Sequence, residues 1–382
     1  MSKTKIPEKV KIRLWGKSAG RCQYEGCNEP LWLDLLTKAE FNTAYVAHII
    51  ADSPDGPRGD KVLSEQLAMD ISNLMLMCDK HHRLIDKEDV EGHPVERLID
   101  MKKRHEKRIE IVTATKEEMK SHVLLYGANI GQHTSLINYA NTTPAMMPHR
   151  YPAETPAIEL SMQGSSFRDH QDLFWTIERQ HLITQFADKV KRRLELRDIT
   201  HLSVFAMAPQ PLLIQLGALI SDICSADVYQ LHREPTDWCW QDDPADFEYI
   251  VKEPSSCYKQ VAINLSLSAS IDIHRIYSVL GEETSVWTLT IPSPNNDYLK
   301  SKNQLKMFRI IIRRLFDKIK FVHGQDTVIS IFPAVPLSIA VELGRVWMPK
   351  ADLPLALYDE NRELGGFQYT FDLGERTGKA AT

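Results

Sequence analysis

The chain has 382 residues, of which 43% are hydrophobic and 25% charged, and its formal net charge is −5. This composition is typical of globular proteins, the length predicts at least two domains, and the negative charge excludes a protein coated in basic surface. No run approaches the roughly 18 uncharged apolar residues of a membrane span, and six cysteines are too few for a disulfide scaffold, so we predict a cytoplasmic protein with no membrane partner.

Two pairs of potential metal ligands lie near the start of the chain. Cys22 and Cys27 are separated by four residues, and Cys78 and His81 are separated by two. Two close pairs of thiol and imidazole ligands, joined by a longer loop, are typical of a tetrahedral structural zinc site. The sequence therefore predicts one structural Zn²⁺ bound by these four residues. The alternative interpretation is a set of unrelated buried cysteines.

The segments YVAHII at 45–50 and SNLMLMCDKHHRLID at 72–86 surround the second pair. Over about residues 10–100 the chain resembles the HNH endonuclease family, whose ββα-metal motif has a strand ending in His, a loop Asn and a helix carrying a final His. His48, Asn73 and His82 fill these three places. The resemblance implies that His48 is the general base, that Asn73 fixes the loop orienting it, and that His82 binds a catalytic Mg²⁺ or similar ion. The alternative for His48 is an ordinary core histidine.

The sequence departs from the HNH pattern at two positions. Many family members have an acidic metal ligand directly before the first His, but Ala47 stands there in this chain. Asp86, one helical turn after His82, is the nearest replacement as a second ligand of the catalytic metal, and Asp52 and Asp55 are weaker candidates. His81 replaces the commoner cysteine, which leaves open whether His81 and His82 exchange roles.

The pattern over residues 94–111, PVERLIDMKKRHEKRIEI, predicts a helix with one basic face. That face is either a solvated helical surface or a phosphate-binding surface of a nuclease domain spanning residues 1–112. Residues 113–157 are weakly patterned and proline-rich, which predicts a semi-rigid connector. From 158 to 382, apolar strands alternate with amphipathic helices, so we expect an α/β fold.

The C-terminal region repeats itself. SVFAMAPQPLLIQLG at 203–217 matches SIFPAVPLSIAVELG at 330–344, and ADVYQL at 226–231 matches ADLPLALY at 351–358. Each copy predicts a strand, a proline-containing turn, a helix and a second strand. We therefore expect two Rossmann-like pseudo-repeats, at about 158–270 and 271–382. Composition alone could also produce two similar units. Ligands of such sheets bind beyond the carboxyl ends of the strands, near helix N-termini that attract phosphate.

An HNH module followed by a duplicated Rossmann-like region resembles the HNH-SAVED effectors of bacterial CBASS anti-phage defence, whose SAVED domain has CARF-like repeats. The resemblance implies a nuclease that degrades double-stranded DNA only after the sensor binds a cyclic di- or trinucleotide made by a partner nucleotidyltransferase. It also implies a homo-oligomer, a dimer at rest that forms a higher oligomer such as a tetramer on activation.

The candidate ligand pocket combines turn residues with aromatic and basic side chains. The turns at the two helix starts would bind phosphate, the aromatic rings would stack on bases, and the cations would pair with phosphate. Simple packing is an equally good interpretation for each tryptophan. The predicted pocket residues are Pro209, Gln210, Pro211, Arg233, Trp238, Trp240, Tyr258, Lys259, Pro336, Leu337, Ser338 and Tyr358.

Two other functions compete with a ligand-gated nuclease. A restriction-type HNH nuclease would cut without a ligand and read DNA with a basic C-terminal half, but residues 235–254 are markedly acidic. A non-enzymatic zinc-dependent nucleic-acid binder would keep all its activity without His48.

Overall fold

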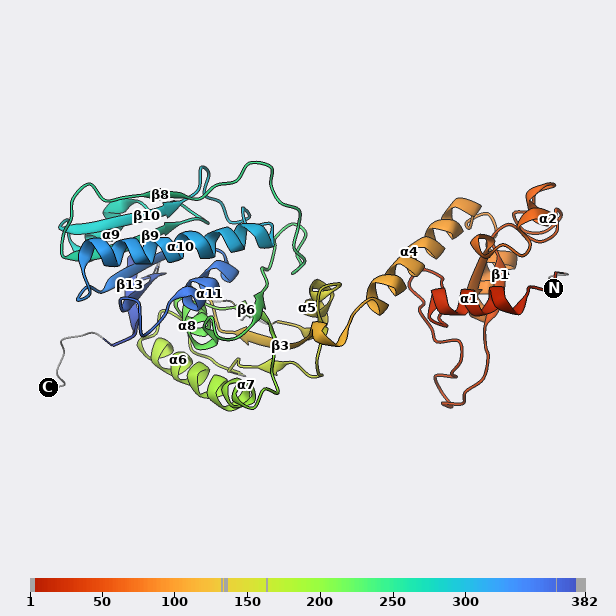
Figure 1. Ribbon diagram of the computed structural model, residues 1–382, viewed down its shortest axis with the longest axis horizontal. Helices are drawn as coiled ribbons and strands as arrows, with labels where there is room; N and C mark the ends of the chain where they lie inside the picture. Colours follow the sequence, from red (N-terminus) through yellow and green to blue (C-terminus); the bar gives the residue numbers. More distant parts are fainter. Residues whose placement is uncertain (1–3, 132, 134–136, 163, 362, 376–382) are drawn as a thin grey trace. The chain divides into compact units, whose positions relative to one another are not determined.

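The computed structural model of the chain describes residues 4–131, 133, 137–162, 164–361 and 363–375. It contains two compact units, residues 1–116 and 117–382 (Figure 1). The outer ends of the two predicted domains, 1–3 and 376–382, lie outside the described residues.

The first unit is built around two short antiparallel strands. Its elements are α1 (Glu8–Ser18), β1 (Tyr45–His48), α2 (Leu63–Leu67), β2 (Leu74–Met77), α3 (Asp79–Arg83) and α4 (Val95–Thr113). The strands pair with Tyr45 opposite Met77 and His48 opposite Leu74. Helix α3 follows β2 after a single residue, and a π-helical turn over Leu84–Glu88 extends it. This order places the end of β1 beside the helix that carries His82.

The second unit contains two mainly parallel sheets. The first sheet has the order β4-β3-β6-β7, with β5 also paired to β3, and all its pairings are parallel. Its strands are β3 (Lys120–Gly127), β4 (Tyr151–Pro152), β5 (Ile158–Glu159), β6 (Leu202–Met207) and β7 (Ala226–Val228). Strands β3 and β6 are almost wholly buried, as their continuous apolar runs require.

The second sheet has the order β13-β12-β11-β9-β10-β8, in which the four central strands are parallel and the two edge strands antiparallel. Its strands are β8 (Ile250–Lys252), β9 (Gln260–Ser266), β10 (Thr284–Thr290), β11 (Ile329–Ala334), β12 (Leu355–Asn361) and β13 (Gly366–Leu373). The predicted strand-helix-strand units are confirmed as β6-α8-β7 and β11-α11-β12.

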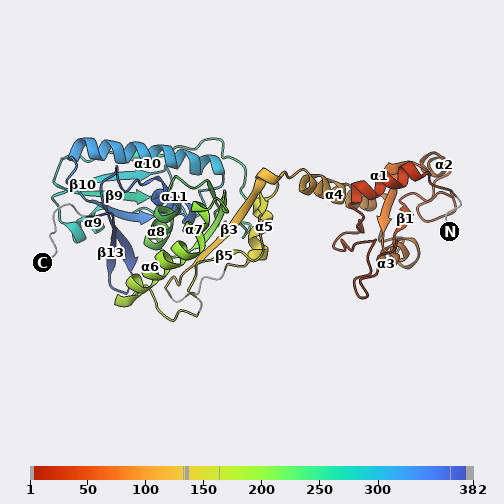
Figure 2. The same cartoon turned by 60° about the horizontal axis from the view of Figure 1, so that its bottom comes forward.

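Helices cover and connect these sheets. They are α5 (Tyr139–Met146), α6 (Asp172–Phe186), α7 (Arg192–Glu195), α8 (Gln210–Ile220), α9 (Ile273–Leu280), α10 (Lys302–His323) and α11 (Leu337–Val346). Figures 1 and 2 show α8 and α11 side by side between the two sheets, and each also contacts strands of the opposite sheet. Among the helices that the structure describes, none combines the length and apolar character needed to cross a bilayer.

The two central helices touch at a matched pair of glycines. A Cβ atom on Gly217 would lie 1.9 Å from the carbonyl oxygen of Val341, and one on Gly344 would lie 1.9 Å from that of Ile214. Each glycine therefore meets the residue three positions before the other glycine. The contact is pseudo-symmetric, and it explains why the sequence repeat retains glycine at both positions.

We expect Gly217→Ala to destabilise the second unit by about 3 kcal/mol, because the added methyl group meets rigid backbone rather than a mobile side chain. Urea unfolding of the full chain measures this effect. Gly16→Ala is the matched control, since nothing lies within 4 Å of the Cβ position at this helical glycine. An unchanged unfolding midpoint for Gly217→Ala would show that α8 and α11 do not pack backbone against backbone at this glycine.

The structure differs from the predicted domain boundaries in two places. Residues 120–127, predicted within the connector, form β3, whose partner β6 lies some 80 residues further along the chain. The predicted boundary between the repeats, at 270/271, falls inside the second sheet, because β8 and β9 pair with β10. A strand such as β3 is stabilised by pairing with a distant part of the chain, so its own sequence need not show a strong local periodicity.

Candidate functional site

Four thiol and imidazole groups converge in the first unit. Cys22 and Cys27 lie in the loop after α1, Cys78 directly precedes α3, and His81 lies within that helix. Their ligand atoms all lie within 4.8 Å of one another, and the Sγ atoms of Cys78 and Cys22 are 3.1 and 3.8 Å from His81 Nδ1. Three thiols and one imidazole at these spacings fit a tetrahedral zinc ion. The structure thus brings all four predicted zinc ligands together.

Neighbouring side chains hold this cluster in place. The ring of Tyr24 stacks on His81, with centroids 4.2 Å apart and planes 4° apart. Glu25, in the loop between the two cysteines, accepts hydrogen bonds from Arg97 at 2.6 Å and from Arg104 at 3.1 Å. Helix α4 therefore braces the metal-ligand loop with its basic side chains.

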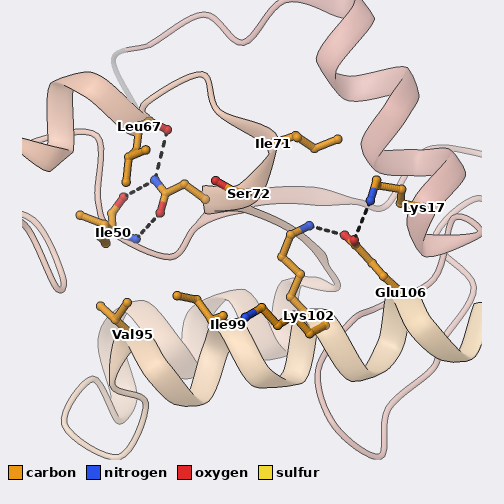
Figure 3. Close-up of a pocket in the computed structure, with 11 residues that line it drawn as sticks. Lys17, Ile50, Leu67, Ile71, Ser72, Val95, Ile99, Lys102 and Glu106 are labelled. Carbon is orange, nitrogen blue, oxygen red and sulfur yellow. Dashed lines mark hydrogen bonds and ion pairs between the residues drawn. The ribbon is translucent and has the colours of Figure 1, made fainter.

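Further basic residues of α4 pair within the protein. Lys102 is buried and pairs with Glu106, which also accepts from Lys17 at 3.0 Å (Figure 3). These groups close one end of a mainly apolar hollow of about 430 Å³, lined by side chains such as Ile50 and Ile99. The ion pairs favour a structural role for this face over a free phosphate-binding surface.

His48 and Asn73 lie at the same end of the strand pair, where β1 ends and β2 begins. The side-chain oxygen of Asn73 accepts from Ile50 N at 2.8 Å, and its amide nitrogen donates to Ile50 O at 2.8 Å and to Leu67 O at 3.3 Å. These bonds fix the backbone that follows His48. Nε2 of His48 lies 2.9 Å from the carbonyl oxygen of Ala68. Because a carbonyl only accepts, Nε2 carries the proton and Nδ1 keeps a free lone pair.

A cleft of about 600 Å³ lies beside this hairpin. His48, Asp52, His82 and Asp86 all contribute to its wall. The ring of Tyr45 stacks on His82, with centroids 4.9 Å apart. With Asp79, which also lines it, the cleft collects two imidazoles and three carboxylates, a combination suited to activating water and to binding a divalent cation that keeps open coordination positions.

Asp86 has a more constrained environment than the sequence predicted. Its Oδ1 accepts from Arg58 at 2.7 Å, and its Oδ2 lies 3.3 Å from His82 Nε2. Burial opposes ionisation of Asp86, but the hydrogen bonds from His82 and Arg58 outweigh it and hold the pKa of this carboxyl below its usual value. Sequence reasoning missed Arg58, although the loop SPDGPRG at 53–59, with two glycines and two prolines, marks a tightly built segment.

The second unit brings the starts of α8 and α11 together. Gln210 at the first turn of α8 accepts from Val335 N at 3.2 Å, and Ser338 in α11 donates to Gln230 from its amide at 3.1 Å and its hydroxyl at 2.9 Å. Arg345, near the end of α11, donates to Ser221 O just beyond the end of α8. The two helices thus run in the same direction, with both N-termini beside the carboxyl ends of β6 and β11.

Six predicted pocket residues lie at these helix starts, namely Pro209, Gln210, Pro211, Pro336, Leu337 and Ser338. Ser338 is buried, and its backbone N–H already donates to the side-chain oxygen of Gln230, so one N–H group in the first turn of α11 has a partner within the protein. Gln230 was not predicted, because a single glutamine after a strand has no distinctive spacing.

The aromatic residues are pseudo-symmetric and packed. Phe205 stacks on Tyr229 with centroids 4.4 Å apart, and Phe332 stacks on Tyr358 with centroids 4.5 Å apart. Trp238 is 4% exposed and meets Phe205 edge-on at 5.2 Å. Its ring is therefore part of the core, so the structure contradicts the expectation that Trp238 is free to stack on a base.

The other predicted pocket residues are dispersed. Trp240 is half-buried against His232, with centroids 5.7 Å apart, and Arg233 lies exposed in the same loop. Tyr258 and Lys259 precede the first residue of β9, at the opposite end of the parallel strands from the turn before α11. The structure therefore contradicts their assignment to one pocket with Pro336, because strand direction places them at opposite edges of the sheet.

This pair of Rossmann-like sheets with two central helices defines the fold class of the second unit. The chain belongs to the SAVED family, because the model of the SMODS-associated and fused to various effectors sensor domain matches residues 182–373. No curated protein matches the chain.

The chain is similar to solved structures of Cap4 receptors from two bacteria. One is the Acinetobacter baumannii Cap4 SAVED/CARF-domain containing receptor with the cyclic trinucleotide 3′3′3′-cAAA, at 12% identity and a TM-score of 0.42, covering 74% of this chain and 61% of that one. The other is the Moraxella osloensis Cap4 SAVED/CARF-domain containing receptor, at 10% identity and a TM-score of 0.38, covering 83% and 70%. The chain spans less than two thirds of the length of the Acinetobacter receptor.

Proposed function

We propose that this chain is a metal-dependent HNH endonuclease that degrades double-stranded DNA when its SAVED domain binds a cyclic oligonucleotide, as in CBASS anti-phage defence. The observation that carries the nuclease proposal is the cleft shared by His48 and His82, on a strand-strand-helix frame beside the Cys/His cluster. Two imidazoles with separate hydrogen-bond partners can take two separate roles there.

In this proposal the Nδ1 atom of His48 takes the proton from the attacking water. The hydrogen bond to Ala68 O places the proton of the neutral ring on Nε2 and fixes the ring, so that Nδ1 can accept a proton as a general base requires. His82 would hold a divalent cation such as Mg²⁺, which supplies charge stabilisation at the phosphate when bound. Asn73 keeps the backbone after His48 in place.

The Cys/His cluster has a structural role in the proposal. Cys22, Cys27, Cys78 and His81 would bind Zn²⁺ and so join the loop after α1 to the start of α3. Because His82 is the next residue in that helix, the zinc site fixes the backbone that carries the catalytic imidazole. Its donor set is closed, which suits structural rather than catalytic zinc.

For the sensor, membership in the SAVED family and the paired helix starts support binding of a cyclic di- or trinucleotide supplied by a partner nucleotidyltransferase. Helix N-termini favour phosphate, and α8 and α11 present two of them side by side. Ligand binding across the two halves would change the assembly of the homo-oligomer, from a dimer to a higher oligomer such as a tetramer, and so activate the nuclease.

Plasmid degradation by the purified full chain in Mg²⁺, with and without a panel of cyclic di- and trinucleotides, tests this proposal. We expect cleavage only with a particular ligand, together with an increase in oligomer size measured by light scattering. Strong cleavage without ligand would instead favour a restriction-type HNH nuclease. No cleavage under any condition would favour a non-enzymatic nucleic-acid binder.

A further inference from the structure

We propose that Arg58 and Asp86 are a positioning pair that orients the His82 ring, so that His82 offers Nδ1 to the catalytic cation and Asp86 does not bind that cation itself. The inference rests on the proposed nuclease function. It assigns to the loop at 53–59 a role that the HNH resemblance did not supply.

Arg58 joins the two parts of the frame that carry the two histidines. Its guanidinium donates to Ile49 O at 2.7 Å, directly after β1, and to Ile85 O at 2.6 Å, beyond α3. The same group donates to Asp86 at 2.7 Å, and its side chain is only 6% exposed. A planar guanidinium can satisfy several acceptors at fixed angles, whereas a lysine ammonium cannot reproduce this geometry.

The loop that delivers Arg58 is sterically specified. The backbone of Arg58 has a φ of 56°, a left-handed conformation that is uncommon for any residue with a side chain. A Cβ atom on Gly59 would lie 2.3 Å from Pro54 O, and one on Gly56 would lie 2.6 Å from the Cβ of Ala51. The chain therefore turns tightly on two glycines and holds Arg58 in a costly conformation, which a surface arginine would not need.

The pair fixes the protonation pattern of His82. Asp86 Oδ2 lies 3.3 Å from His82 Nε2, and an ionised carboxylate can only accept, so Nε2 carries the proton. Nδ1 is then the nitrogen with a free lone pair. Tyr45 stacks on the ring and restricts its rotation. A histidine held by a carboxylate in this way is a better and more rigid metal ligand than an unsupported one.

The partners of Asp86 argue against direct metal binding by its carboxylate. Both of its oxygens already face a donor, one from Arg58 and the other from His82. Ala47, where many HNH proteins have an acidic ligand, offers none. His82, rather than Asp86, is then the residue that this helical segment offers to a cation such as Mg²⁺, and substrate phosphate and water would contribute to its coordination.

The first test measures the tautomer of His82 in the wild-type protein. In the zinc-loaded full chain labelled with ¹⁵N-histidine, long-range proton-nitrogen correlation spectra report which nitrogen of His82 is protonated, and His82→Gln assigns the signal. We expect the Nε2-protonated form in the absence of Mn²⁺. The Nδ1-protonated form would overturn the proposal, because that nitrogen could not then bind the cation.

The second test measures Mn²⁺ binding by calorimetry in Arg58→Lys and Asp86→Asn. We expect the dissociation constant to rise by about 10- to 100-fold in each variant, as for loss of other residues that support metal ligands. The double variant should raise the dissociation constant about as much as either single variant does, because the two residues act through one another. Zinc content and the thermal unfolding midpoint show whether each variant is folded.

Arg313→Lys is the matched control, because Arg313 forms an equally close pair with Asp352 in the second unit, at 2.7 Å. It should leave Mn²⁺ affinity unchanged. Loss of all Mn²⁺ binding in Asp86→Asn, with normal binding in Arg58→Lys, would instead identify Asp86 as a direct ligand and overturn the inference. Failure of the wild-type chain to cleave DNA would count against the nuclease function but would leave the His82 protonation result standing.

Discussion

His48→Ala is expected to reduce the rate of DNA cleavage by about 10²- to 10⁴-fold, the range over which general bases contribute to catalysis. The physical reason is specific to one atom. The hydrogen bond from Nε2 to Ala68 O leaves Nδ1 as the only ring nitrogen that can take a proton from water. Alanine provides no proton acceptor, so attack would depend on water deprotonated by solvent.

The measurement is the rate of plasmid cleavage at saturating Mg²⁺ and activating ligand. His274→Ala is the matched control, because His274 is exposed on α9 in the second unit, where its ring meets that of Tyr277. Zinc content and Mn²⁺ affinity should remain normal in His48→Ala, which separates loss of the base from loss of the fold. Full activity in a folded His48→Ala protein would exclude His48 as the base.

The convergence of the four thiol and imidazole groups in the first unit could be predicted from the sequence because these residues come in short, regular spacings. Cys78, His81 and His82 are fixed relative to one another by a helix that begins directly after Cys78. Pairing of β1 with β2 then brings His48 and Asn73 together, although a long loop separates them in the sequence. Local geometry was sufficient to place these residues.

Arg58 could not be predicted in the same way. Its importance depends on carbonyl groups at Ile49 and Ile85, which are 9 and 27 residues away in the sequence. The same reason applies to Asp86. The sequence predicts it as a metal ligand, but its partner Arg58 comes from a loop that is distant in the sequence. A carboxylate one turn after a histidine looks like a ligand until its other neighbours are known.

The second unit shows the limit of periodicity. The repeat identified both strand-helix-strand units and the matched glycines, because close packing requires the same residue in both copies. Strand β3 was assigned to a connector, although its side chains are buried, because the partner strand lies far along the chain. Trp238 could not be distinguished from a base-stacking residue without knowledge of Phe205.

Removal of zinc is expected to unfold the first unit and to leave the second folded. Structural zinc contributes about 10–16 kcal/mol of apparent binding free energy in small domains, more than the stability of most domains of this size. Cys22 and Cys78 are buried, and burial raises the pKa of both thiols, so without a cation the cluster would hold neutral thiols and nothing would join the loop after α1 to the start of α3. Cys78→Ser should therefore have the same effect as chelation, because it removes a ligand at the start of α3.

Zinc content by mass spectrometry, combined with limited proteolysis, distinguishes the two units in one experiment. After chelation, we expect cuts throughout residues 4–116 and protection of the second unit, which has its own continuous core. Cys239→Ser is the matched control, because this exposed cysteine lies outside the cluster. Since α3 carries both His81 and His82, a first unit that remained folded and cleaved DNA without zinc would require another source of rigidity for the catalytic helix. The packing of α1 and α4 on β2 would then have to hold the cleft by itself.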